Sequence, residues 1–252
     1  MELSQNKRFS VQKTARKYHK WLMLFLSAQF VIWSVTGTYM VFFDIDYIHG
    51  DSLVQNHQTK INPDNIQYTV KQLTDKYPSA TDINVVKFID QEVYVFTNKT
   101  SNYMVAANSG ELLSPLNSRQ AINAAKYYYS GEGKVINVEL ISDNPPFELR
   151  ARALPAWRID FDDFGSPTIY VSAQTGELVG KRHQFWRIFD WMFRLHVMDY
   201  DDGADIDNSL LFWLTLFATV AAFCGLLLAY FQLAKTYQRH TSKRKELPEN
   251  LA

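Results

Sequence analysis

The sequence predicts an α+β membrane protein in which two transmembrane helices form a hairpin around a folded middle domain. Residues 21–43 and 209–233 are uncharged and apolar, and each stretch reaches the roughly 20 residues that a helix needs to cross a bilayer. Basic residues flank each stretch on the side of its chain terminus. Between the stretches the chain is acidic, because residues 44–208 carry 23 Asp and Glu against 15 Lys and Arg.

The basic flanks predict the orientation of both helices. Residues 1–20 and 234–252 hold clusters of Lys and Arg, which the positive-inside rule places in the cytoplasm. The first apolar stretch is longer than the core of a signal peptide and ends in bulky side chains, so we expect an uncleaved anchor. We therefore expect a protein of the bacterial inner (plasma) membrane whose main domain is periplasmic. No feature indicates a nucleic-acid partner, whereas membrane lipids are expected partners.

The periplasmic domain, residues 44–182, contains an internal repeat. Asn108-Ser109-Gly110-Glu111 and Gln174-Thr175-Gly176-Glu177 match at a spacing of 66 residues, with Gly for a positive φ after a strand. The copies span about 62–113 and 118–180, and each is predicted to be one helix followed by a small antiparallel sheet. The predicted helices are 65–77 and 118–129, and the predicted strands are 83–89, 92–97, 103–107, 135–141, 156–161 and 168–172.

Residues 183–208 lead from this domain into the second span. Trp and Phe alternate with occasional Arg over 182–198, which favours a helix lying in the membrane interface. An acidic loop follows, and its carboxylates at Asp201, Asp202 and Asp205 could collect iron through hard oxygen ligands, although most such runs are only solvated loops. The loop lacks the spacing of a calcium-binding EF-hand.

Two membrane-proximal patterns resemble a known family. One is Arg16-x-x-His19-x-Trp21-Leu22 followed by Thr36-Gly37, and the other is Leu195-His196 before the second span. Together with the Gly-Glu turns, these patterns resemble the PepSY-associated transmembrane proteins. The resemblance implies a link to iron uptake and to haem-containing reductases of ferric iron and ferric siderophores. Many members have four or more spans, whereas this sequence predicts two.

Histidine is the residue type that could hold a redox cofactor, because the single Cys224 cannot build a cluster and no Cys-x-x-Cys-His is present. With the resemblance, His196 and His19 are expected to ligate the iron of haem b, and His49 and His183 are further candidates. Three carboxylates near them in sequence could orient an imidazole: Asp44, Asp46 and Asp199. Alternatively, such histidines only place a polar tip at headgroup depth.

The resemblance implies a membrane ferric (siderophore) reductase acting on ferric iron or a ferric chelate, with no catalytic residue identified. No flavin or nicotinamide fingerprint is present, so a membrane quinol or a separate donor protein would supply electrons. Two spans cannot surround a macrocycle, which favours a homodimeric four-helix bundle packed through Ala221, Gly225 and Ala229. The alternative is a non-enzymatic, membrane-anchored module whose tandem repeats bind a periplasmic peptide or protein.

Overall fold

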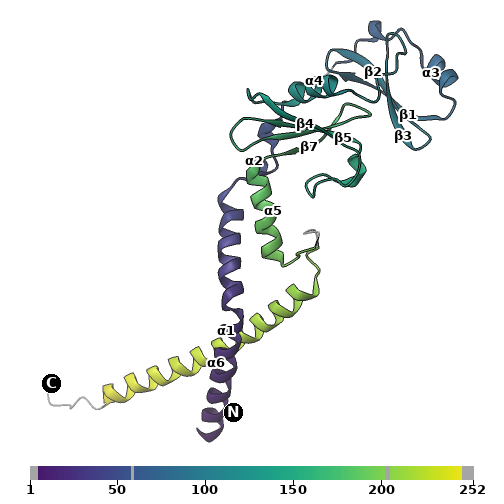
Figure 1. The fold of residues 1–252 in the computed structure, drawn as a ribbon. Helices are drawn as coiled ribbons and strands as arrows, with labels where there is room; N and C mark the ends of the chain where they lie inside the picture. Colours follow the sequence, from purple (N-terminus) through teal and green to yellow (C-terminus); the bar gives the residue numbers. More distant parts are fainter. Residues whose placement is uncertain (1–4, 58–59, 202–204, 246–252) are drawn as a thin grey trace. The chain divides into compact units, whose positions relative to one another are not determined.

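The chain divides into a helical unit and a middle unit (Figure 1). The computed structural model describes residues 5–57, 60–201 and 205–245. The helical unit combines residues 1–40 with 192–252, and the middle unit is residues 41–191. In chain order, two small antiparallel sheets with helices come after the first long apolar helix and before the second, which confirms the predicted α+β class.

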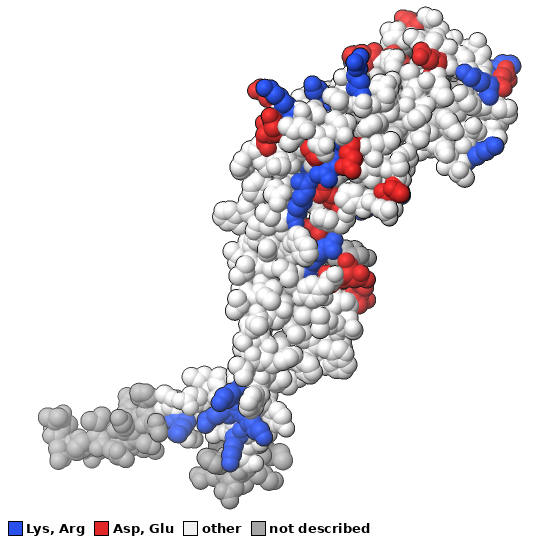
Figure 2. All heavy atoms as spheres, in the orientation of Figure 1, with Lys and Arg blue, Asp and Glu red and all other residues white. Residues whose placement is uncertain are grey.

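The long helices α1 (Gln5–Phe42) and α6 (Ser209–Lys245) extend beyond the predicted spans because each continues through its basic flank. Their apolar segments, Ser10–Phe42 and Ser209–Gln238, are long enough to cross a membrane, and most of their residues are exposed. On the face drawn in Figure 2, Lys and Arg gather near the N-terminal part of α1. Exposed apolar side chains between charged ends are typical of helices that contact lipid.

A small apolar cluster joins α1 to α6 inside the helical unit. Leu26 of α1 is fully buried and packs with Leu214 and Ala221 of α6 and with Met198. Bilayer hydrocarbon provides no hydrophobic drive toward helix association, so this contact relies on close packing and on polar bonds between the helices.

The middle unit contains the two predicted repeats. The first repeat has α3 (Val70–Lys76) and a sheet of order β1-β2-β3, and the second has α4 (Ser118–Tyr128) and a sheet of order β4-β5-β6-β7. All neighbouring strands are antiparallel. The strands are β1 (Ala80–Phe88), β2 (Gln91–Asn98), β3 (Ser101–Ala106), β4 (Val135–Ile141), β5 (Ala156–Phe161), β6 (Thr168–Ser172) and β7 (Leu178–Arg182).

The two repeats share one hydrophobic core. Along β2, Val93 and Phe96 point to opposite faces, as the two-residue period of a strand requires. Val93 packs with α4 and with Ile159 of the second repeat, whereas Phe96 packs with Leu73 of α3. The first sheet is therefore covered by its own helix on one face and by the other repeat on the other.

The two matching Gly-Glu turns have the same backbone conformation at glycine. Gly110 and Gly176 both have φ of 71°, a conformation that L side chains rarely adopt. The sequence did not predict β7, which follows the second of these turns and pairs with β6. The first helix was predicted too long, because Thr69 and Gln72 form a capping box that begins α3 at Val70.

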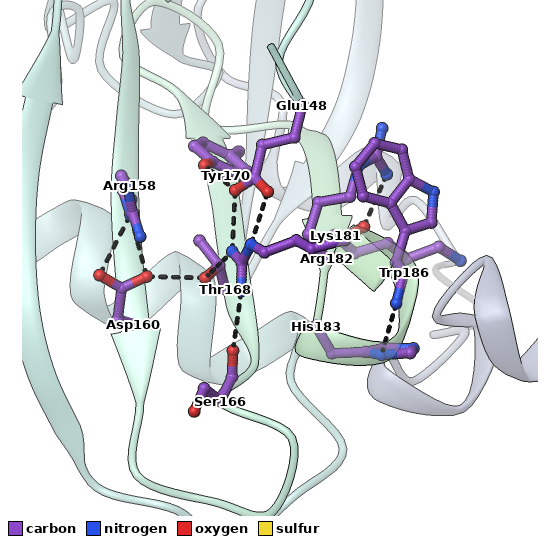
Figure 3. Close-up of polar contacts among 11 residues, drawn as sticks. Glu148, Arg158, Asp160, Ser166, Thr168, Tyr170, Lys181, Arg182, His183 and Trp186 are labelled. Carbon is purple, nitrogen blue, oxygen red and sulfur yellow. Dashed lines mark hydrogen bonds and ion pairs between the residues drawn. The ribbon is translucent and has the colours of Figure 1, made fainter. Parts of the chain in front are cut away.

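A buried ion pair fastens the beginning of α5 (Gln184–Val197) to the second sheet (Figure 3). Arg187 donates from Nε and Nη2 to the two carboxylate oxygens of Glu148, at 2.7 and 2.8 Å. Tyr170 donates its hydroxyl to the same carboxylate, and Arg187 also donates to Thr168. Burial alone would raise the pKa of Glu148, but the hydrogen bonds from Arg187 and Tyr170 outweigh it and hold the pKa below its usual value.

We expect Glu148→Gln to lower the free energy of unfolding at neutral pH by about 3–5 kcal/mol, because Arg187 would lose the charge that offsets its burial. The pKa of Glu148 is lower in the folded state than in the unfolded state. Its contribution to the free energy of unfolding is therefore complete above the ordinary pKa of about 4.3, and it is lost as the pH falls through the pKa of the folded state. Urea unfolding followed by near-ultraviolet circular dichroism at a series of pH values measures both effects.

The exposed Glu139 supplies the matched control, Glu139→Gln, which should unfold like the wild type at every pH. Equal acid sensitivity of the wild type and Glu148→Gln would contradict the assignment of this ion pair.

Candidate functional site

His19 of α1 is bonded to the backbone of α6. Its Nδ1 lies 2.9 Å from the carbonyl oxygen of Ala221, and the ring is half-buried. A carbonyl can only accept, so Nδ1 donates its N–H, and in the neutral ring Nε2 holds the lone pair. No partner for Nε2 is present among the described residues.

Small residues on α6 make this contact possible. Ala221 is fully buried, and a Cβ added at Gly225 would lie 3.0 Å from Cε1 of His19. The carbonyl of a helical residue points toward the residue four positions later, so a glycine at 225 leaves the Ala221 oxygen open to a second donor. The small-residue face predicted for a dimer therefore contacts α1 of the same chain at Ala221 and Gly225.

His196, in the last turn of α5, is bonded to α1. Its Nδ1 lies 2.9 Å from Oγ1 of Thr36, a residue that is 2% exposed. The Thr36 hydroxyl donates its hydrogen to the carbonyl of Ile32 at 2.8 Å, so His196 Nδ1 is the donor of the other bond. Nε2 of His196 again has no partner among the described residues.

Two further residues of α1 position His196. Trp33 donates from its indole nitrogen to the His196 carbonyl oxygen at 2.7 Å. Gly37 lies against the ring, since an added Cβ would be 3.5 Å from Cε1. The Thr36-Gly37 and Leu195-His196 patterns of the sequence are thus in contact, and the sequence analysis did not assign this role to Thr36 or Trp33.

The two histidines occupy separate layers of the helical unit. His19 and Thr36 are 17 residues apart on α1, which corresponds to about 26 Å along a straight helix. Because His196 contacts Thr36, the two imidazoles of one chain cannot ligate the same iron. Each can contribute one ligand near one end of the apolar segment.

The other candidate histidines have different surroundings. His183 is 2% exposed; its Nε2 lies 2.8 Å from the Tyr47 carbonyl oxygen, and its Nδ1 accepts from the Trp186 backbone. Both nitrogens are engaged, and burial lowers the His183 pKa, so this histidine supports the fold. His49 ends α2 (Ile45–Ile48) with an exposed side chain, and its ligand role stays a prediction.

The expected carboxylate partners of the histidines have other roles. Asp44 accepts from the backbone of Asp46 and Tyr47 and so caps α2, while Asp199 accepts from the backbone nitrogens of Asp201 and Asp205. The Ala221 carbonyl and the Thr36 hydroxyl orient the imidazoles instead, which corrects the expectation from the sequence.

Asp202 lies outside the described residues, so the three-carboxylate iron site cannot be placed as a whole. Within the described ranges no group of three or more His, Cys, Asp or Glu could hold a metal ion. Iron collection by Asp201, Asp202 and Asp205 therefore stays a prediction.

Two apolar helices that hold a histidine at each end, with paired helix-and-sheet repeats between them, define a membrane protein with a tandem-repeat domain. Residues 16–247 match the model of the PepSY-associated TM region, and the chain belongs to this family. No curated protein sequence matches the chain. The predicted resemblance is confirmed, whereas its link to iron and to reduction stays a prediction.

Proposed function

We propose that this protein is an inner-membrane b-type haem protein that passes electrons to ferric iron or a ferric chelate in the periplasm. One observation supports the proposal above all others. His19 and His196 each have Nδ1 fixed by a protein acceptor and Nε2 without a partner among the described residues. A histidine that would hold haem iron needs this arrangement, in which a second bond sets the tautomer and the ring orientation and leaves Nε2 for the iron.

The residues present fit a haem iron better than a hydrated metal ion. The atoms that would bind the metal are imidazole nitrogens. The residues around them are apolar or small: Trp33, Gly37, Ala221 and Gly225. Bound haem supplies reversible one-electron chemistry. The chain's own part is to bind the iron through His19 and His196, to orient the rings through Ala221 and Thr36, and to exclude water with apolar helices.

We further propose a homodimer, because two helices do not enclose a macrocycle and a second copy would supply the missing wall. Ala221 and Gly225 already contact α1 in their own chain, so the dimer must use other faces of the helices. The electron donor would be a membrane quinol or a separate protein, and Asp201, Asp202 and Asp205 would collect iron five to nine residues after His196.

The orientation follows from the basic flanks, and we propose that both termini are cytoplasmic and residues 44–182 periplasmic. Reporter fusions test this directly. Fusions at residue 252 and near residue 10 should report the cytoplasm, and an insertion near Asn117 should report the periplasm. A periplasmic C-terminus would overturn this orientation.

Alanine variants test the ligand assignment. We expect His196→Ala to lose haem absorbance and ferric reduction together, and His19→Ala to lose both in full or in part, because no neighbouring side chain replaces an imidazole–iron bond. Thr36→Val should keep haem but shift its redox midpoint, since Thr36 acts only by orienting His196. Absorption spectra, haem per chain and redox titration are the measurements.

His57→Ala is the matched control. His57 also bonds a carbonyl oxygen, that of Tyr127, and it stacks on the Tyr127 ring within the middle unit. It should change neither haem content nor reduction. If both membrane-proximal histidine variants kept full haem content, the assignment would be wrong, and a colourless wild type that captures a periplasmic peptide would favour the non-enzymatic alternative.

A further inference from the structure

Three arginines line a cavity of about 440 Å³ on the middle unit. Arg150, Arg152 and Arg182 lie around it, together with Glu148, Ala153 and Val179. Arg150 and Arg152 are exposed, and neither side chain has a hydrogen bond or ion pair among the described residues. Figure 2 shows Lys and Arg side chains interleaved with Asp and Glu side chains in the part of the middle unit near the beginning of α5.

The acidic residue of this cavity attracts Arg182 but forms no ion pair with Arg150 or Arg152. Glu148 directs both carboxylate oxygens to Arg187, so its charge is already paired inside the protein. Arg182 stacks on Trp186 with its guanidinium carbon 4.2 Å from the ring centroid, and its inaccessible Nε has no hydrogen-bond partner among the described residues (Figure 3). The cavity therefore carries unpaired positive charge, which attracts an anion.

Within the middle unit, an aromatic contact joins the residue that follows α1 to the segment that follows Arg182. α1 ends at Phe42, and the ring of the next residue, Phe43, lies 5.6 Å from the ring of Phe185. Phe185 is three residues after Arg182. Arg182 is therefore three residues from a ring that contacts the residue directly after the apolar segment of α1. We expect residues next to the end of a spanning segment to lie at the depth of the lipid headgroups.

Exposed aromatic rings surround the same region. Phe147 is 57% exposed and stacks on Trp186, the ring that also contacts Arg182. Phe164 is 85% exposed and packs against Phe185. Aromatic rings beside arginines are typical of protein surfaces that lie in a membrane interface.

We propose that the cavity formed by Arg150, Arg152 and Arg182 binds the phosphate of an anionic phospholipid, with the exposed rings of Phe147 and Phe164 against the acyl chains. Arginine suits this ligand because its planar fork donates two parallel hydrogen bonds to phosphate oxygens. A zwitterionic lipid carries no net charge to balance the two unpaired guanidinium groups. A free anion would not use the exposed rings. The site does not depend on the haem proposal.

Binding of short-chain lipids to the detergent-solubilised full chain tests the proposal. The probes are dihexanoyl phosphatidylglycerol, dihexanoyl phosphatidylcholine and inorganic phosphate, and the dissociation constant is measured for each. An arginine near an anionic lipid surface contributes about fivefold in affinity. We therefore expect the double variant Arg150→Gln/Arg152→Gln to bind phosphatidylglycerol about 25-fold more weakly than the wild type. Both residues are exposed, and near-ultraviolet circular dichroism verifies that the fold is kept.

A charge-matched control separates the site from general attraction. Arg119→Gln/Lys126→Gln removes the same charge from exposed positions on α4 and should bind phosphatidylglycerol like the wild type. Equal loss in the control would overturn the proposal. The proposal would also be overturned if the wild type bound phosphatidylcholine as tightly as phosphatidylglycerol. If it bound inorganic phosphate as tightly as phosphatidylglycerol, the cavity would be a site for a free anion and not for a lipid.

Discussion

An imidazole within or beside a bilayer must bond its N–H inside the protein, because hydrocarbon offers no partner. This constraint accounts for the main contacts of the helical unit. His19 donates to α6, and His196 donates to α1, so α1 is bonded to both other helices through one imidazole each. The glycine at 225 follows from the same constraint, since a Cβ there would lie only 3.0 Å from Cε1 of His19.

The helix that carries the second of these histidines begins in the middle unit. Arg187, near the beginning of α5, is held by Glu148, and His196 lies in the last turn of the same helix. Glu148 in turn belongs to a buried polar network with Tyr170 and Thr168 on β6. α5 thus begins in the middle unit and ends in the helical unit.

Much of the fold could be predicted from the sequence because the patterns are periodic and local. The lengths of the two apolar stretches predicted both long helices. The Gly-Glu turns and the alternation of apolar and polar residues in the strands predicted both repeats. β7 was not predicted, because Leu178–Arg182 is short and has no alternation of apolar and polar residues. The core shared by the two repeats was not predicted either, because Val93 and Ile159 meet through tertiary packing that no local sequence pattern encodes.

The candidate site was predictable in its residues but not in its bonds. The family patterns identified His19 and His196. The hydrogen-bond acceptors of these histidines, the Ala221 carbonyl and the Thr36 hydroxyl, are remote from them in sequence. A backbone oxygen also cannot be recognised from a pattern of side chains. Nearby carboxylates were the natural expectation, yet Asp44 and Asp199 bond backbone N–H groups of their own loops. The same limit applies to His183, whose burial only the folded domain reveals.

The haem content of the wild-type protein tests most directly whether the two Nε2 atoms are ligands. The protein would be made in haem-replete cells, purified in mild detergent and examined by absorption before and after reduction. We expect a Soret band, a sharp α band on reduction, and complete release of the haem into acidified acetone, because the chain has no site for covalent attachment. A colourless protein that also fails to take up added haem would contradict a ligand role for His19 and His196.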